Sequence, residues 1–290
     1  IYLMVKIFKV NNKKFIIFNI KKKKLIKKIF HKDNLKNLKN EIIGYKKFRK
    51  LYYFKIPKFY SSCLTEKDKN IIIEYIYGTK PSIFDLNRIY NRKKIILKNT
   101  LIKKYLNDFK KKYKNYYYFK SLYKDLKFFK TSNKKILTTF THGDFANYNC
   151  LKSKNFFYVF DFEKFGERII LYDFLNWFIH PLFSKYAKLA SLFNLKINSK
   201  YFINMTTIFS NILIWNIIYK IRWFKSKIDK KNFELYVLLY LFEKIIVINN
   251  DLKFVKNKKN KELAMSIILI LRIVYKNFLK NIKYKITISL

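Results

Sequence analysis

The N-terminal part of the chain alternates short apolar runs with lysine-rich segments, a pattern that predicts a small sheet carrying one helix. The runs at 15–20 and 25–30 are rich in Phe and Ile and are joined by lysines, so they predict two strands and a turn. Leu, Ile and Tyr recur at helical spacing over 35–49, and two further strands are predicted at 52–56 and 71–77.

Most of the remaining chain carries longer periodic segments. Apolar residues recur at helical spacing at 84–123, 174–192, 201–224, 232–248 and 261–282. Strands with one helix, followed by mostly helices, predict an α+β fold with two lobes. We place the boundary after the last N-terminal strand, which gives a small antiparallel-sheet lobe at 1–77 and a larger, mainly helical lobe at 78–290.

One short region between the helical segments departs from the helical pattern. Apolar runs at 150–151 and 155–160 flank a short polar turn and predict a β-hairpin. Asn149 and Asp161 then lie near the open end of that hairpin, beside the loop that carries Asp144. Mg²⁺ prefers hard oxygen ligands and keeps several waters, so one amide and one carboxylate, together with phosphate oxygens, suit it.

These three side chains are the parts that a kinase needs. One carboxylate, Asp144, takes the proton of the acceptor hydroxyl, while the amide of Asn149 and the carboxylate of Asp161 hold Mg²⁺ on the nucleotide phosphates. The full motif is His-Gly-Asp, four intervening residues, Asn, and then an Asp-Phe-Glu triplet, followed by a Tyr-Asp-Phe helix start: His142, Gly143, Asp144, Asn149, Asp161, Glu163 and Asp173.

This motif resembles that of the aminoglycoside phosphotransferase and choline kinase family, which has the protein-kinase-like fold. The resemblance implies use of ATP and Mg²⁺, with Asp144 and His142 in the catalytic group. It implies further that Asn149, Asp161 and Glu163 form the metal site. In the family, the Asp that matches Asp173 supports the catalytic loop and does no chemistry.

The resemblance also implies a phosphate-binding lysine on an N-terminal strand and a glutamate on the helix that holds it. Lys28 precedes an apolar pair, as the family lysine usually does, and Lys27 is the close alternative on the opposite face of the strand. Glu41 is the only acidic residue in the interior of the predicted helix, so we assign it as the partner.

The end of the last N-terminal strand resembles the family hinge, where backbone groups bind the adenine edge. Glu74, Tyr75 and Ile76 occupy this position. Two expected features are missing. No glycine-rich loop covers the phosphates, because 10–14 reads Val-Asn-Asn-Lys-Lys, although many members of the family lack that loop too, and no His-Pro pair follows Asp144. The covering of the phosphates and the surroundings of the acceptor hydroxyl are therefore expected to differ from the family pattern.

The charge of the chain, +46, is a feature of nucleic-acid-binding or membrane-binding proteins. Only six of the 64 basic residues are arginine, the residue favoured for bidentate phosphate and guanine recognition. Lys, Asn, Ile, Phe and Tyr are all abundant, which indicates a compositional bias rather than a specific polyanion partner. We therefore expect no specific nucleic-acid partner, while peripheral membrane contact through surface lysines stays open.

Cysteine content and hydropathy indicate a reducing cytoplasm. The two cysteines, Cys63 and Cys150, are too few and too far apart to define a disulfide framework or a zinc site. Lysines interrupt the N-terminal apolar stretch, so no signal peptide is predicted, and no apolar run reaches the ~20 residues of a transmembrane helix. The pattern does not define an oligomeric state.

The predicted function is ATP- and Mg²⁺-dependent transfer of the γ-phosphate to a hydroxyl of a small molecule, such as a sugar, an amino alcohol or a related metabolite. Clustered acidic residues are scarce in the large lobe, which disfavours a cationic aminoglycoside as substrate. Two alternatives come from other functional classes: a catalytically inactive kinase-like binding module, and a basic nucleic-acid-binding protein.

Overall fold

The structure is a computed structural model of the 290-residue chain. It describes residues 3–10, 13–20, 23–31, 34–51, 55–65, 68–82, 85, 97–116, 119–129, 132–153, 156–192, 204, 230–255 and 257–288. The contacts divide the chain into two compact units, which are described separately. The sheet unit comprises Ile1–Ile96 and Thr139–Arg168, and the helical unit comprises Leu97–Thr138 and Ile169–Leu290.

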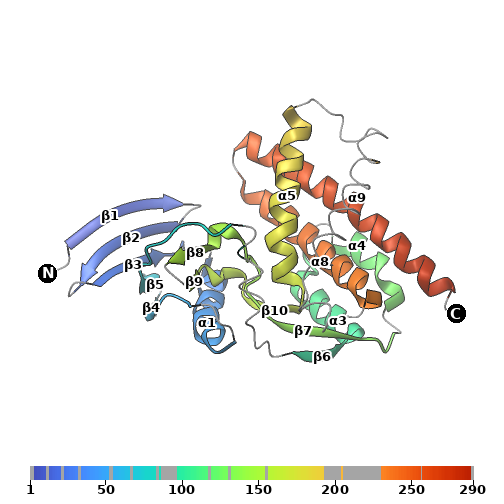
Figure 1. Ribbon diagram of the computed structural model, residues 1–290, viewed down its shortest axis with the longest axis horizontal. Coiled ribbons are helices and arrows are strands. Elements are labelled where there is room, and N and C mark those ends of the chain that lie inside the picture. Colours follow the sequence, from blue (N-terminus) through green and yellow to red (C-terminus); the bar gives the residue numbers. More distant parts are fainter. Residues whose placement is uncertain are drawn as a thin grey trace. The chain divides into compact units, whose positions relative to one another are not determined.

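The sheet unit is built on an antiparallel sheet of five strands in the order β1-β2-β3-β5-β4 (Figure 1). Its strands are β1 (Leu3–Val10), β2 (Lys13–Ile20), β3 (Lys23–Ile29), β4 (Phe59–Leu64) and β5 (Lys69–Glu74). Helix α1 (Leu35–Leu51) follows β3, and its apolar stripe, including Leu38, Ile42 and Tyr45, is buried. An apolar stripe at helical spacing is buried in this way against a sheet or another helix.

The second part of the sheet unit holds the motif residues. The strand β7 (Lys135–Thr141) leads into it, and η3 (Asn147–Asn149), β8 (Cys150–Ser153), β9 (Phe156–Val159), η4 (Phe162–Lys164) and β10 (Gly166–Ile169) follow. Strands β8 and β9 form the predicted hairpin, with Cys150 opposite Val159. A small sheet has the order β10-β7-β6, where β6 is Lys98–Leu101, so β7 and β10 run from one unit into the other.

The helical unit contains α3 (Ile102–Tyr113), α4 (Phe119–Asp125), η2 (Lys127–Phe129), α5 (Tyr172–Leu192), α8 (Lys230–Asp251), η5 (Leu252–Phe254) and α9 (Lys258–Ile288). Residues 235–242 of α8 are all apolar and buried, so this part of the helix is apolar on every side and lies at the centre of the unit (Figure 1). Helices α5 and α9 pack against it. Among the helices in the described ranges, none is both long and apolar enough to cross a lipid bilayer.

The predicted α+β class is confirmed, with an antiparallel N-terminal sheet carrying one helix and a mainly helical C-terminal part. The strand predicted at 52–56 is wrong in its described part, because Lys55 forms only an isolated bridge and the strand that pairs with β5 is Phe59–Leu64. The strand predicted at 71–77 ends at Glu74. Within the helix predicted at 84–123, β6 pairs with β7 instead. The predicted helix at 201–224 lies outside the described residues, apart from residue 204.

Candidate active site

Asp161 lies at a backbone position that few residues other than glycine adopt. Its φ is 70° and its ψ is 60°, which is the left-handed region, and it immediately precedes η4. Asp is among the residues that tolerate this conformation best, and such conformations persist only where the surrounding structure imposes them. Here Phe162 supplies the constraint, because its ring is fully buried and packs on Tyr45, Phe48 and His142.

Gly44 brings α1 close to this segment. A Cβ atom at Gly44 would overlap the side chain of Phe162, so the lack of a side chain allows α1 and η4 to approach each other. Glu41 lies one turn earlier on α1 and is buried beside the same segment. Asn40, the residue before it, donates a hydrogen bond of 3.0 Å from Nδ2 to the backbone carbonyl of Glu163. Two adjacent residues of α1 therefore position the Asp-Phe-Glu triplet.

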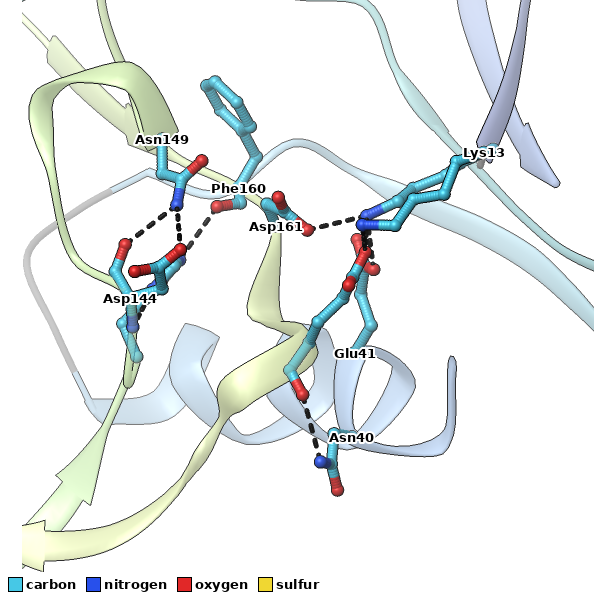
Figure 2. A network of polar contacts seen from close by, with 10 residues as sticks. Lys13, Asn40, Glu41, Asp144, Asn149, Phe160 and Asp161 are labelled. Carbon is cyan, nitrogen blue, oxygen red and sulfur yellow. Dashed lines mark hydrogen bonds and ion pairs between the residues drawn. The ribbon is translucent and has the colours of Figure 1, made fainter. Parts of the chain in front are cut away.

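A cluster of charged side chains forms where β3, α1 and η4 meet (Figure 2). The ammonium group of Lys28 lies 2.6 Å from Glu41 Oε2, 2.7 Å from Asp161 Oδ1 and 2.6 Å from Glu163 Oε1. Lys13, the first residue of β2, also forms an ion pair with Glu163 Oε1. These five residues are called the charge cluster below.

Burial and charge act against each other in this cluster. Burial opposes the charged form of Lys28, but the carboxylates of Glu41, Asp161 and Glu163 outweigh it and hold the pKa of the ammonium well above its ordinary value. Burial raises the pKa of the Glu41 carboxyl to about 8, against the attraction of Lys28. For Asp161, burial is outweighed by Lys28 and Lys13, which hold its pKa below the ordinary value. Asp161 is therefore more readily ionised than Glu41.

Gly143 shapes the loop that carries Asp144. Its φ is 82°, and a Cβ atom there would overlap the backbone carbonyl of Lys164, so both the conformation and the close approach require glycine. Thr141, just before the loop, donates to the carbonyl of Gly166 at 3.0 Å and accepts from Arg168 at 3.0 Å. The loop is thus held against the segment that follows the Asp-Phe-Glu triplet.

His142 is fully buried and joins the two halves of the motif. The backbone N–H of Asp144 donates to His142 Nδ1 at 3.2 Å, so Nδ1 is an acceptor and its ring proton is on Nε2. Nε2 then donates to the backbone carbonyl of Phe160 at 2.8 Å. The histidine ring therefore fixes the distance between the loop of Asp144 and the residue that precedes Asp161.

The structure brings Asp144 and Asn149 into direct contact. The amide Nδ2 of Asn149 donates to the backbone carbonyl of Asp144 at 2.8 Å and lies 3.4 Å from Asp144 Oδ2. Figure 2 shows the amide oxygen of Asn149 pointing away from Asp144. Tyr148, which is 43% exposed, donates from its hydroxyl to Asp144 Oδ1 at 3.3 Å, and partial burial together with Asp144 raises the pKa of this hydroxyl. It therefore stays protonated and acts as a donor.

The donor set fits a magnesium ion. Carboxylate oxygens of Glu41, Asp161 and Glu163 lie within 4.8 Å of one another. Asn149, which supplies an amide oxygen, and Asp161 flank the hairpin of β8 and β9. All are hard oxygen ligands, which Mg²⁺ prefers. Of the predicted ligands, Asp161 and Glu163 are in the charge cluster, whereas Asn149 contacts Asp144.

Lys28 and Lys27, the two candidates for the phosphate-binding lysine, lie in different surroundings. Lys28 is buried in the charge cluster, whereas Lys27 pairs with Asp68 at 3.3 Å, with both side chains partly exposed.

The three predicted hinge residues lie at and after the end of β5. Tyr75 donates its backbone N–H to the carbonyl of Lys24 at 3.1 Å, the carboxylate of Glu74 accepts from the backbone N–H of Lys58 at 3.0 Å, and Ile76 is partly buried.

Lys24 lies beside the predicted hinge residues, and Asp173 is the remaining residue of the sequence motif. The ammonium of Lys24 lies 4.3 Å from the ring centre of Tyr75 and donates to the hydroxyl of Tyr77 at 3.0 Å. Asp173 is buried in the first turn of α5, in the helical unit. Sequence reasoning missed Lys13, Asn40 and Tyr148. Departures from the family pattern at 10–14 and 145–148 pointed to the segments of Lys13 and Tyr148, whereas nothing pointed to Asn40.

Comparisons with known proteins identify the fold. No protein-family model and no curated protein sequence matches the chain. A solved structure from Ralstonia eutropha, assigned as an aminoglycoside phosphotransferase, is similar with a TM-score of 0.57 and 11% identity over 97% of this chain and 93% of that one. The choline kinase LicA from Streptococcus pneumoniae has a TM-score of 0.53 and 11% identity over 93% and 94% of the two chains.

The aminoglycoside phosphotransferase APH(4)-Ia, in a ternary complex with AMP-PNP and hygromycin B, is similar with a TM-score of 0.51. It shares 9% identity over 94% of this chain and 93% of that one. The chain therefore has the protein-kinase-like fold of small-molecule phosphotransferases, as the motif predicted. The structural similarity to this aminoglycoside phosphotransferase and this choline kinase extends over nearly the whole chain, at 11% sequence identity in both cases.

Proposed function

We propose that this protein is a phosphotransferase that uses ATP and Mg²⁺ to phosphorylate a hydroxyl group of a small molecule. The observation that carries the proposal is the charge cluster itself. A buried lysine is held at once by Glu41 on α1 and by Asp161 and Glu163 on the motif segment, next to the Asp144–Asn149 pair. Phosphoryl transfer depends almost entirely on such positioning and on charge stabilisation.

Each residue has a distinct role in this proposal. Asp144 orients the acceptor hydroxyl and takes its proton. Lys28 binds the nucleotide phosphates, and Glu41 holds Lys28 in place. Asn149, Asp161 and Glu163 would hold Mg²⁺, which neutralises charge on the phosphates when it is bound. His142 completes the catalytic group as a positioning residue, because both its ring nitrogens are used in fixing the loop.

The similar structures support the same class of reaction. APH(4)-Ia forms a ternary complex with AMP-PNP and hygromycin B, so a protein of this fold binds an ATP analogue together with its small-molecule substrate. By analogy, backbone groups of Glu74, Tyr75 and Ile76 at the end of β5 would bind the adenine edge. We propose accordingly that residues 1–77 bind the nucleotide and that residues 78–290 supply catalysis and acceptor binding, in a cytoplasmic enzyme.

The two alternatives fit the site less well. A catalytically inactive binding module has no need of an intact Asp144, Asn149 and Asp161. A nucleic-acid-binding protein would use the surface lysines, and it gives no reason to gather three carboxylates around one buried lysine, since burying charge is costly. Such a protein would bind polyanions in a strongly salt-dependent way.

Thermal unfolding with and without Mg·ATP, at fixed ionic strength, tests the proposal. At a nucleotide concentration of about 100 times Kd, binding stabilises a protein by about 2.7 kcal/mol, which is a rise of several degrees in Tm. We expect this rise for the natural chain, and its loss on chelation of Mg²⁺ or in Asp161→Ala. The matched control is Asp68→Ala, which removes a partly exposed acid paired with Lys27. No response of the natural chain to Mg·ATP, or an unchanged response in Asp161→Ala, would contradict the proposal.

Turnover is tested separately with a panel of hydroxyl-bearing metabolites. Release of ADP from ATP is followed by a coupled assay, and sugars and amino alcohols are offered as acceptors. Acceptor-dependent ADP release identifies the substrate class. Mg·ATP binding without turnover on any acceptor would favour the inactive binding module.

A further inference from the structure

The segment between β1 and β2 occupies the position where related folds carry a glycine-rich loop over the phosphates, yet it contains no glycine. Lys13 is the first residue of β2 and pairs with Val10, the last residue of β1. Its side chain reaches Glu163, 150 residues further along the chain, and forms an ion pair with it (Figure 2). The two side chains are only 14% and 12% exposed, so this is not an ordinary surface pair.

The next residue shows that this placement is particular to Lys13. Lys14 follows it on β2 and is exposed, because successive side chains of a strand point to opposite faces. Lysine is abundant throughout the chain, so the presence of a lysine here carries no information by itself. The informative observation is that the side chain of Lys13 is directed into the charge cluster, onto one of the proposed metal-binding carboxylates.

The partners of the two cluster lysines differ. Lys28 is held by three carboxylates at 2.6–2.7 Å and is 4% exposed, which fixes its ammonium group in place. Lys13 is paired with Glu163. The side chain of Lys13 is long and flexible, and it starts from the first residue of β2. When Glu163 binds another cation, this pairing is weakened, and the ammonium of Lys13 needs a new anionic partner.

We propose that Lys13 is a second phosphate-binding lysine, which contacts the β- or γ-phosphate of the bound nucleotide and holds Glu163 when no nucleotide is present. The inference rests on the proposed function, since it concerns the same nucleotide site. Phosphate binding by Lys13 would explain how the phosphates are covered without a glycine-rich loop. Such a loop binds phosphates through backbone N–H groups, whereas a lysine supplies a mobile point charge from the same position.

Binding measurements on three variants test this role. Lys13→Met and Lys13→Gln remove the charge, and Lys14→Met is the matched control on the exposed face of the same strand. Affinities are measured by calorimetry for Mg·AMP-PNP and, separately, for adenosine, which has no phosphate. Tm of each variant is recorded first. The glutamine variant keeps a polar end, so that a folding defect of the methionine variant leaves the test intact.

We expect both Lys13 variants to bind Mg·AMP-PNP about 10- to 100-fold more weakly, the usual contribution of a hydrogen bond to a charged group. Adenosine affinity should be unchanged, and Lys14→Met should behave like the natural chain for both ligands. A merely structural role of Lys13 would weaken both ligands together, and that result would overturn the inference. Equal binding of Mg·AMP-PNP by the natural chain and both Lys13 variants would overturn it as well.

The same experiment separates the two proposals. If the natural chain fails to bind Mg·AMP-PNP at all, the proposed function is wrong and the role of Lys13 is rejected with it. If the natural chain binds Mg·AMP-PNP in a Mg²⁺-dependent way and the Lys13 variants bind it equally well, only the role of Lys13 is rejected.

Discussion

Each unit of the molecule buries charged side chains, and the two sets are built differently. In the helical unit, the ammonium of Lys244 donates to Asn176 Oδ1 at 2.6 Å, and the carboxylate of Glu243 accepts from the hydroxyl of Tyr113 at 2.6 Å. Each of these two buried charges has a neutral hydrogen-bonding partner on a different helix, and Glu243 has in addition the partly exposed ammonium of Lys112 at 3.7 Å. In the sheet unit, the charge cluster sets carboxylates directly against lysines, and the side chain of Asp161 is 34% exposed.

The difference supports the proposal that the charge cluster is a binding site, whereas the charges of the helical unit are structural. Lys244 and Glu243 tie α8 to α5 and α3, and both are almost completely buried. The charge cluster has three carboxyl groups for two ammonium groups, and Asp161 gives it an opening to solvent. A surplus of carboxylate oxygen at a partly exposed position is suited to a cation, whereas a sealed pair is suited to holding helices together.

The largest effect is expected for Asp144→Asn. The amide cannot take the proton of the acceptor hydroxyl, and general-base catalysis contributes roughly 100- to 10,000-fold to the rate. Turnover should fall by about that factor, while Mg·ATP binding and Tm stay close to those of the natural chain. Steady-state kinetics and thermal unfolding measure the two properties. Full turnover in this variant would refute the role of Asp144 as the base.

The chain shows clearly which features can be predicted from sequence. The motif residues are recognisable because their chemistry, order and spacing occur together, and Glu41 stands out because acidic residues are scarce near it. The structure places Glu41 2.6 Å from Lys28, which confirms that these two residues are paired, although their role in binding nucleotide stays a prediction. Local pattern suffices where the signal is rare in the chain.

Other features depend on tertiary contacts and had no local signal. Strand β4 reads Phe-Tyr-Ser-Ser-Cys-Leu and is mostly exposed, so it lacks the apolar face that marks a strand, and pairing with β5 defines it. Strand β6 was hidden in a helical pattern and is defined by its pairing with β7. Lys13 and Asn40 belong to residue types so common here that only the fold shows which of them reach the site.

A smaller effect is expected in the helical unit, from Asn176→Leu. The buried ammonium of Lys244 loses its 2.6 Å hydrogen bond to Asn176 Oδ1, and a hydrogen bond to a charged group contributes about 1.5–3 kcal/mol. The free energy of unfolding should fall by that amount, with Mg·ATP affinity unchanged. The double variant Asn176→Leu with Lys244→Met removes the charge too and should regain part of the loss. A loss of Mg·ATP affinity at unchanged stability would mean that this pair is functional after all.

Gly44→Ala is the sharpest test of the comparison, and its expected loss of stability is smaller than that of Asn176→Leu. A Cβ atom at this position would overlap Phe162, and overpacking costs about 1–3 kcal/mol. Alanine also favours a helix over glycine by about 0.8–1 kcal/mol, so the net loss of stability should be about 1 kcal/mol. Glu41 and the Asp-Phe-Glu triplet are nevertheless pushed apart, because Gly44 sets the distance between α1 and η4.

Mg·ATP affinity should therefore fall more than stability in Gly44→Ala, which calorimetry and chemical unfolding can compare directly. Gly166→Ala is the matched control, since the nearest atom to a Cβ there is at 3.5 Å, an ordinary van der Waals distance. It should change neither property appreciably. Equal losses of binding free energy and of unfolding free energy in Gly44→Ala would contradict this expectation. The packing of α1 on η4 would then serve only to hold the sheet unit together, as the hydrogen bond between Lys244 and Asn176 does for the helical unit.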